Sequence, residues 1–355
     1  MRLLHLDAAT HGGAGQNQVR LLMRALAGQK LEQVCVMPAG SPLEARLRAE
    51  DLPYEAVRGT EGPGARFTRA AIRMARGVDV IHSHDEGALS AGYWAARLRR
   101  VRWVATCRIL APEAPLRWNR ADRVIAISET VRDFLLRRGV DAGRVQVIHS
   151  GIDADEIRRL PAMVPSLRDR LAFAPGRFLA GSVGSLHAFR NQRLVAQAAA
   201  RARDLAWVVI GDGPEHHAIR AAIAAHGVEE NVRLVGNIAD PRTALRELDV
   251  VVAPATGEAL GTGLLEAMAL DLPVLAADDA GAAEILGPVA AAAGIGLFRP
   301  GDPAALAAAV LRLQADAELR AGLIAAQRNR LAAFSIDRTA RATLALYQQL
   351  AATGR

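Results

Sequence analysis

The sequence predicts an α/β protein with two doubly wound parallel sheets in tandem, each covered by helices on both faces. Its 355 residues are enough for two domains. Short apolar runs of β type alternate with longer segments of helical period, which is typical of a parallel sheet flanked by helices. The alternation lapses across 151–176, where three prolines fall, so we expect an interdomain linker there.

Each half of the chain contains its own alternating series. In the first half we expect strands at 3–7, 33–37, 78–83, 102–106, 123–127 and 145–149, and helices at 16–26, 42–50, 87–99 and 129–138. In the second half we expect strands at 178–183, 207–210, 232–235, 250–253 and 274–276, helices at 193–202, 215–226, 263–269 and 280–285, and a largely helical tail at 303–350. Ligands of such sheets bind at the carboxyl ends of the strands, so a cleft between the two domains is the expected site.

The composition excludes several classes of protein. Residues 1–165 carry 25 Arg and Lys against 18 Asp and Glu, and residues 166–355 carry 19 against 19, so the net charge of +7 belongs to the first half. Cys35 and Cys107 are too few for a disulfide framework, which favours a cytoplasmic protein. The apolar stretch at 1–7 is too short and too soon interrupted for a signal peptide, so none is expected. No apolar run approaches the about 20 residues of a membrane span. Aromatic residues make up 4%, and no nucleic-acid-binding module is present.

Two glycine-containing segments follow predicted strands and open predicted helices. Gly12 and Gly13 precede the first helix, where free backbone N–H groups suit a phosphate or a sugar, although a tight turn explains them equally well. In the second segment, Gly261, Thr262, Gly263 and Leu264 bring backbone N–H groups to a helix start, between Glu258 and Glu266. Carboxylates in so apolar a segment are expected to have partners.

The second segment resembles the E-x7-E signature of retaining glycosyltransferases of family 4, which have the GT-B fold of two facing Rossmann-like domains. Further stretches resemble that family in the expected order: 121–128 (ADRVIAIS), 147–153 (VIHSGID), 209–214 (VIGDGP) and 232–236 (VRLVG). We therefore expect an acceptor-binding domain at 1–163, with a C-terminal helix at about 336–355 packing back onto it, and a donor-binding domain at 164–335.

The resemblance implies a donor site for a nucleoside-diphosphate sugar in the second domain. Glu266 would accept hydrogen bonds from the ribose diol, Glu258 would hold hydroxyls of the transferred sugar at the reaction centre, and the backbone at 236–238 (Gly236, Ile238) would contact the base. Arg190, after Gly184 and Ser185, would stabilise the leaving diphosphate. The chain departs from the family at Ser185, where an Arg is usual; Arg190 replaces the family's Lys, and His187 is a candidate for the missing cation.

On the acceptor side, His82 and His84 end a predicted strand and are expected to face the cleft. The family has a His where this chain has Arg108, which suits an anionic acceptor; a structural His and an exposed strand-end Arg are the alternatives. Arg66, Arg69, Arg73 and Arg76 form one stripe of a predicted helix, with Phe67, Ala70, Ala71 and Met74 opposite. The stripe is a candidate for an anionic membrane surface or for phosphates, with a solvated helix face as the alternative.

Together these features predict a retaining glycosyltransferase that needs no metal or other cofactor. It would move a sugar from a UDP- or GDP-linked donor to a lipid-linked or polysaccharide acceptor, as in lipopolysaccharide biosynthesis, in the cytoplasm or at the inner face of its membrane. Asp153 and Asp155 form a D-x-D pattern, but at the domain junction, where no metal role is expected. The alternatives are a sugar-nucleotide 2-epimerase of the same fold and a non-catalytic partner subunit.

Overall fold

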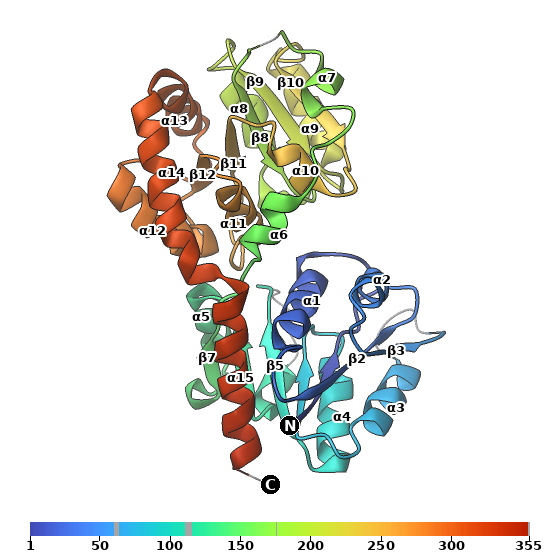
Figure 1. Ribbon diagram of the computed structural model, residues 1–355. Helices are drawn as coiled ribbons and strands as arrows, with labels where there is room; N and C mark the ends of the chain where they lie inside the picture. Colours follow the sequence, from blue (N-terminus) through green and yellow to red (C-terminus); the bar gives the residue numbers. More distant parts are fainter. Residues whose placement is uncertain (60–63, 111–115, 175, 354–355) are drawn as a thin grey trace. The chain divides into compact units, whose positions relative to one another are not determined.

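The computed structural model describes the chain except for residues 60–63, 111–115, 175 and 354–355 (Figure 1). The chain forms two compact units, which we call the N-unit (Met1–Ile152 with Phe334–Arg355) and the C-unit (Asp153–Ala333). Each unit contains one parallel sheet with helices packed against it, as the sequence predicts. Among the described residues, no helix is long and apolar enough to span a bilayer.

The N-unit sheet has seven parallel strands in the order β3-β2-β1-β4-β5-β6-β7. Its strands are β1 Arg2–Leu6, β2 Glu32–Pro38, β3 Tyr54–Val57, β4 Val80–Ser83, β5 Arg102–Cys107, β6 Arg123–Ala126 and β7 Val145–Val147. Its helices are α1 Ala14–Leu26, α2 Pro42–Ala49, α3 Ala65–Met74, α4 Leu89–Arg99, α5 Glu129–Arg137 and α15 Ile336–Ala352, with 3-10 turns η1 Leu116–Arg120 and η2 Ala142–Arg144. The edge strand β3 was not expected, because its four residues are all only partly buried and show no apolar run.

The C-unit sheet has six parallel strands in the order β10-β9-β8-β11-β12-β13. Its strands are β8 Leu179–Val183, β9 Ala206–Ile210, β10 Val232–Gly236, β11 Val250–Ala253, β12 Val274–Ala277 and β13 Leu297–Phe298. Its helices are α6 Ala154–Arg159, α7 Leu167–Leu171, α8 Arg193–Ala199, α9 His216–Ala225, α10 Pro241–Leu245, α11 Thr262–Ala269, α12 Ala280–Ala293, α13 Pro303–Ala315 and α14 Ala317–Leu331, with η3 Ala188–Arg190; the 3-10 turn η4 Ala332–Phe334 closes the series.

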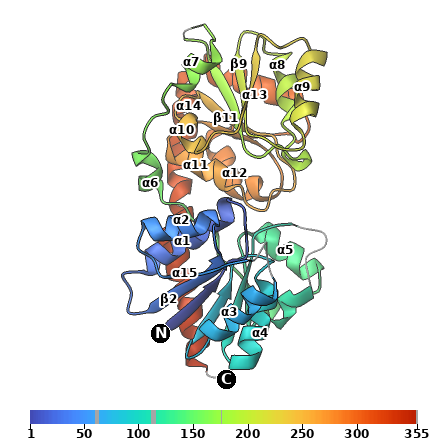
Figure 2. The ribbon, with the colours of Figure 1, turned by 90° about the vertical axis from the view of Figure 1, so that its right-hand side faces the viewer.

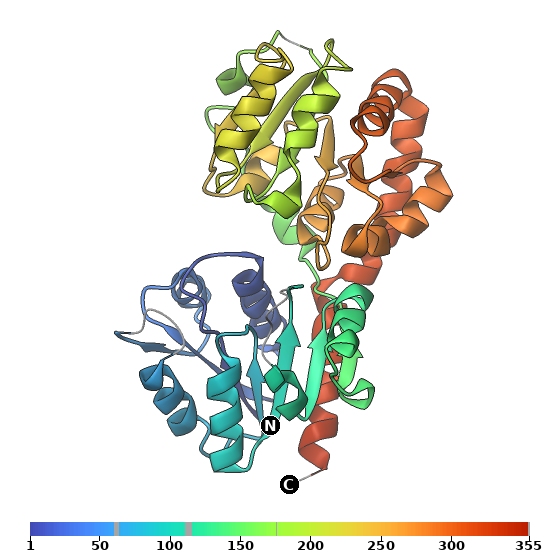
Figure 3. The ribbon, with the colours of Figure 1, turned by 180° about the vertical axis from the view of Figure 1, so that it is seen from behind.

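The C-terminal helix α15 belongs to the N-unit core. It packs against α1, and Figure 3 shows the red helix alongside the N-unit strands. Tyr347 is fully buried in a core cluster with Leu3, Leu26 and Val80, and Ile152 pairs with Ser335 in a parallel bridge. The predicted helix at about 336–355 thus ends at Ala352, and its last two residues lie outside the described part of the chain.

The segment predicted as a linker is partly helical, and the first compact unit ends at Ile152 instead of residue 163. Helix α6 packs on α11, where Arg158 Nε donates to the Ala269 carbonyl at 3.0 Å, and this attaches the segment to the C-unit. Asp153 caps α6 by accepting from the Glu156 backbone N–H at 2.8 Å. The first carboxylate of the D-x-D pattern therefore has a structural partner.

Candidate functional site

In the C-unit, the sheet order reverses between the adjacent strands β8 and β11. β8 leads to β9 and β10 on one side of itself, while β11 and β12 lie on the other side. The carboxyl ends of two such strands form a crevice where ligands of open α/β sheets bind. The loops that leave these two ends, together with helix α11, contain most of the predicted donor-binding residues.

Close approach between loops explains the glycines after β8 and β9. Gly184 has φ +147° and Gly211 has φ +143°, a backbone conformation that residues with a Cβ rarely adopt. A Cβ on Gly211 would lie 1.9 Å from the Gly184 carbonyl oxygen, so no side chain fits between the loops. Gly211 therefore allows the Gly184–Arg190 loop to sit against the end of β9, which fixes the position of Arg190.

Arg190 and Glu258 form an ion pair across the β8–β11 crevice. Arg190 Nη1 donates to Glu258 Oε1 at 2.6 Å, and the Thr256 backbone N–H donates to the Phe189 carbonyl at 2.8 Å, which joins the two loops. The Arg190 guanidinium also lies over the Phe189 ring, 5.2 Å from its centroid. Arg190 Nε is buried and has no hydrogen-bond partner among the described residues, so a donor group remains available to a ligand.

The N-terminus of α11 lies beside the Glu258 carboxylate. Gly261, with φ +95°, precedes the helix, and a Cβ built there would be 3.6 Å from Glu258 Oε2. No side chain caps this end, and no acidic residue stands in the first turn. The first backbone N–H groups of the helix, at Thr262 and Gly263, have no intrahelical acceptor. This end of α11 has the properties of an anion site next to the ion pair.

Glu266 lies one turn into α11, in surroundings that favour its protonated form. Burial raises its pKa to about 7, while the positive charge of Arg242 lowers it and Asp240 and Glu156 raise it. Arg242 donates to both Asp240 oxygens, at 2.8 and 2.7 Å, and its Nη1 lies 3.7 Å from Glu156 Oε1. The sequence around Arg242 contains no motif that indicates a role in the site. Its charged neighbours are Asp240 at the N-cap of α10, Glu156 of α6 and Glu266 of α11.

Of the other predicted donor-site residues, Leu264 is buried in α11, and those described next are exposed or partly exposed. Ser185 is exposed on the β8 loop, and its carbonyl accepts from Gln192 Nε2 at 3.4 Å. His187 is exposed and stacks on Phe189, with ring centroids 6.0 Å apart. Gly236 has φ +80° at the end of β10, and Ile238 follows it, partly buried. Arg190 and His187, the candidate for the missing cation, thus lie on the same loop after β8.

In the N-unit, the corresponding reversal of strand order lies between β1 and β4. Gly12 and Gly13 are exposed before α1, whose first turn contains no acidic residue. Asp85 Oδ1 accepts from the backbone N–H groups of Ala8 (3.0 Å) and Ala88 (3.1 Å), and so holds the loop after β1 against the turn after β4. Burial, and then the charge of Asp85, raise the pKa of Asp7 to about 7.

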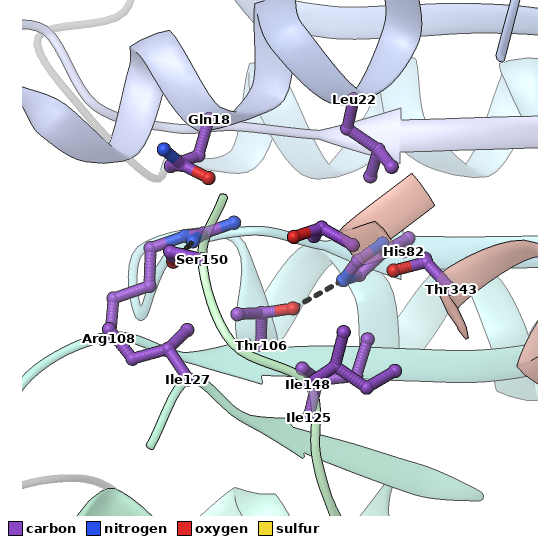
Figure 4. Close-up of a pocket in the computed structure, with 11 residues that line it drawn as sticks. Gln18, Leu22, His82, Thr106, Arg108, Ile125, Ile127, Ile148, Ser150 and Thr343 are labelled. Atoms are coloured by element: carbon purple, nitrogen blue, oxygen red, sulfur yellow. Dashed lines mark hydrogen bonds between the residues drawn. The ribbon is translucent and has the colours of Figure 1, made fainter. Parts of the chain in front are cut away.

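Arg108 lies beneath the start of α1. Its Cδ is 3.7 Å from the position of a Gly15 Cβ, and its Nη1 donates to Ser150 Oγ at 3.0 Å. It lines a cavity of about 20 Å³ together with Gln18, Ser150, Thr106 and His82 (Figure 4), which is large enough for one water molecule. Burial lowers its pKa to about 10, opposed by the charges of Asp7 and Asp85. Its Nε has no partner among the described residues.

His82 and His84, which were predicted to face the cleft, are buried within the N-unit. They are 2% and 1% exposed and lie in the interior with His5, which is fully buried. His82 Nδ1 bonds the Tyr347 hydroxyl at 2.5 Å and its Nε2 bonds Thr106 Oγ1 at 2.6 Å, while His5 Nδ1 and His84 Nε2 are 2.9 Å apart. Tyr347, which comes from the sequence-remote helix α15, covers His82.

The three imidazoles are close enough together to resemble a metal site. Ring nitrogens of His5, His82 and His84 lie within 4.8 Å of one another. However, both His82 nitrogens are engaged by hydroxyl groups, and the His82 and His84 rings are packed with centroids 3.9 Å apart. Burial lowers the pKa of all three rings, so they are neutral, hydrogen-bonded core residues.

The predicted basic helix is present as α3. Phe67, Ala70 and Ala71 are buried, whereas Arg66, Arg69 and Arg73 are exposed. Arg76, also exposed, follows the end of the helix at Met74.

Known proteins resemble the chain over both units. A family model for Glycosyltransferase Family 4 matches residues 12–156, and one for Glycosyl transferases group 1 matches residues 177–316. A 2-deoxystreptamine glucosyltransferase from Streptomyces kanamyceticus is 31% identical over 279 residues, which cover 69% of this chain and 71% of that protein. A D-inositol 3-phosphate glycosyltransferase from Salinispora arenicola is 29% identical and covers 99% of this chain and 87% of its own length.

Solved structures share the fold. Anabaena HepE in complex with UDP and glucose superposes with a TM-score of 0.81 at 22% identity, covering 99% of both chains. Sucrose-phosphate synthase from Thermosynechococcus elongatus gives 0.78 at 20% identity, with the same coverage. Two Rossmann-like units with this likeness define the GT-B fold, and the family models mark the chain as a glycosyltransferase. The chain belongs to glycosyltransferase family 4.

Proposed function

We propose that the protein transfers a sugar from a UDP- or GDP-linked donor to a hydroxyl acceptor, with retention of configuration and without a metal ion. The observation that carries this proposal is the meeting of Arg190, Glu258 and the N-terminus of α11 at the β8–β11 crevice. This site thus combines a positive charge, free backbone N–H groups and a carboxylate. Such a combination suits a diphosphate attached to a hydroxyl-rich sugar.

In this proposal, each group has a defined task. Arg190 and the N–H groups of Thr262 and Gly263 stabilise the negative charge that grows on the diphosphate as the bond from the anomeric carbon to phosphate oxygen breaks. Glu258 accepts hydrogen bonds from sugar hydroxyls, and Glu266 accepts two from the ribose diol. The acceptor oxygen forms its bond on the face that the diphosphate leaves, and its proton passes to a diphosphate oxygen.

The identity of the acceptor is a separate part of the proposal. The notion of a lipid-linked or polysaccharide acceptor rests on the basic N-unit. The activities for which the two relatives above are named favour a second candidate, since 2-deoxystreptamine and inositol 3-phosphate are both small polyhydroxylated rings. Arg108 and the Gly12–Gly13 backbone would serve either acceptor if it carries a phosphate.

A donor and acceptor panel tests the proposal. Nucleoside diphosphate release is measured for UDP- and GDP-sugars with inositol phosphate, 2-deoxystreptamine or a lipid-linked glycan. We expect release to require an acceptor, and Glu266→Ala to abolish it. Release of free nucleotide without any acceptor, with a changed sugar configuration, would instead indicate an epimerase. An inverted anomeric centre in the product would refute retention.

A further inference from the structure

Helices α3 and α4 lie side by side on the N-unit sheet (Figure 2). Their exposed residues form a strongly basic surface. We call this surface the α3–α4 face. It comprises the exposed residues Arg66, Arg69, Arg73, Arg76, Trp94, Arg97, Leu98, Arg99 and Arg100. Arg99 Nε donates to the Ile72 carbonyl at 2.9 Å, which ties the end of α4 to α3.

Two large apolar side chains are exposed within this basic surface. Trp94 is 48% exposed and Leu98 is 60% exposed. They are four residues apart on α4, so they stand on the same side of the helix, and Arg97 lies between them in sequence. By contrast Trp103, Trp118 and Trp207 are at most 2% exposed. Trp94 is thus the exposed one of the four tryptophans.

Acidic groups offset little of the charge of this face. Among the described residues, the ion pair found here joins Arg73 Nη2 to Glu55 Oε1 at 2.5 Å, with the arginine side chain 65% exposed. An exposed pair of this kind contributes little stability, so the arginines are not explained by folding. The α3–α4 face therefore consists of exposed arginines around the two apolar side chains of Trp94 and Leu98.

We propose that the α3–α4 face docks on the anionic surface of a phospholipid bilayer. The arginines contact lipid phosphates, and Trp94 and Leu98 enter the boundary between headgroups and acyl chains. Tryptophan is enriched at this depth because its ring is apolar and its N–H is polar. A stable protein partner would require a larger apolar centre than two side chains. This docking does not depend on the proposed transfer reaction and is tested separately from it.

The position of Trp94 supplies a direct assay on the full chain. Tryptophan emission and its quenching by acrylamide are recorded with vesicles of phosphatidylcholine alone and of phosphatidylcholine mixed with phosphatidylglycerol. We expect the mixed vesicles to shift the emission to shorter wavelength and to protect it from quenching, and added salt to reverse both effects. Trp94→Phe should still sediment with the vesicles but should lose the spectral change, because the other tryptophans are buried.

Charge and apolar variants separate the two parts of the surface. Arg69→Gln with Arg76→Gln should weaken vesicle binding about thirtyfold, since each arginine near an anionic surface contributes about 1 kcal/mol. Trp94→Ser with Leu98→Ser should weaken it about tenfold or more. The matched control is Arg220→Gln with Arg312→Gln, two exposed arginines of the C-unit, which should leave binding unchanged. Thermal unfolding of each variant checks that it folds.

Three outcomes would overturn the proposal. One is absence of binding to the mixed vesicles at low salt. Another is equal loss of binding in the control pair, which would mean that net charge alone is responsible. The third is binding with Trp94 still open to acrylamide, accompanied by equally tight binding to a soluble anionic polysaccharide; this would assign the face to a glycan instead of a membrane.

Discussion

Replacing Arg242 with Met should make nucleotide binding depend more steeply on pH. Arg242 holds its positive charge near Glu266, whose pKa is about 7 because of burial. In the proposed site Glu266 must be ionised to accept both ribose hydroxyl groups. Without the guanidinium, Glu156 and Asp240 would remain and would raise the pKa of Glu266 further. Methionine keeps much of the volume of the arginine stem.

The expected effect can be worked out from that pKa. Near pH 7, about half of the Glu266 side chains are ionised, since the pKa is about 7. If loss of the cation costs about 1.4 kcal/mol, the pKa rises to about 8 and about a tenth remain ionised. Nucleoside diphosphate binding should then weaken about fivefold at pH 7 and return nearly to the wild-type value at about pH 9. Calorimetric titration over this pH range measures both.

A neighbouring arginine provides the matched control. Arg246 follows α10, and its Nη2 donates to the Ile157 carbonyl at 3.2 Å, but it does not contribute to the pKa of Glu266. Arg246→Met should therefore keep the wild-type pH profile. Glu266→Gln should bind weakly at every pH. The reasoning is refuted if Arg242→Met and the wild type share the same pH midpoint, whatever their affinities.

Three further perturbations test the two units. Tyr347→Phe removes the partner of a buried His82 nitrogen, so the free energy of unfolding in urea should fall by about 1–3 kcal/mol; an unchanged value would mean that the hydroxyl group is not needed. Arg190→Met should lower the turnover number by about a hundredfold, and Arg190→Lys by less, if Arg190 stabilises the leaving group; equal rates for all three would exclude that role. Because burial lowers the pKa of His5 to about 4 and that of His82 below 6.5, the unfolded chain binds more protons as the pH falls through 6.5. The stability that they contribute is complete above that pH and is lost below it, which melting temperatures between pH 8 and 5 should show.

The alternating sheet and helix pattern was predictable because its signals are local. Buried parallel strands are short apolar runs, and eleven of the thirteen strands, all except β3 and β13, were expected from such runs. Strand β3 is partly buried throughout, and β13 has two residues, so neither leaves a run. Helices α6, α7 and α10 have at most six residues, too few to show a helical period.

The candidate site was predictable where its residues lie close together in the sequence. Glu258, Gly261 and Glu266 fall within one segment that ends a strand and opens a helix, and the structure places them around one helix terminus. Arg242 escaped prediction because its effect on Glu266 passes between α10 and α11. The burial of His82 escaped prediction for the same reason, since its position at a strand end is visible in the sequence but its contact with Tyr347 of α15 is not.

Burial also affects which side chains of the N-unit are ionised, and therefore where the net positive charge of this unit is located. Asp7, with a pKa raised to about 7, contributes stability that is complete below its ordinary pKa of 3.8 and is lost as the pH rises through 7, opposite in sign to the histidines. Between pH 3.8 and about 7, the folded N-unit holds a proton on Asp7, while burial favours neutral His82. The hydroxyl partner of His82 is Tyr347, 265 residues away in sequence. In the interior at the end of β1 and β4, burial thus disfavours the charged forms of Asp7 and His82 and also lowers the pKa of Arg108. The basic excess of the first half thus acts at the surface, and the α3–α4 face, where the exposed Trp94 accompanies it, is where a membrane would meet it.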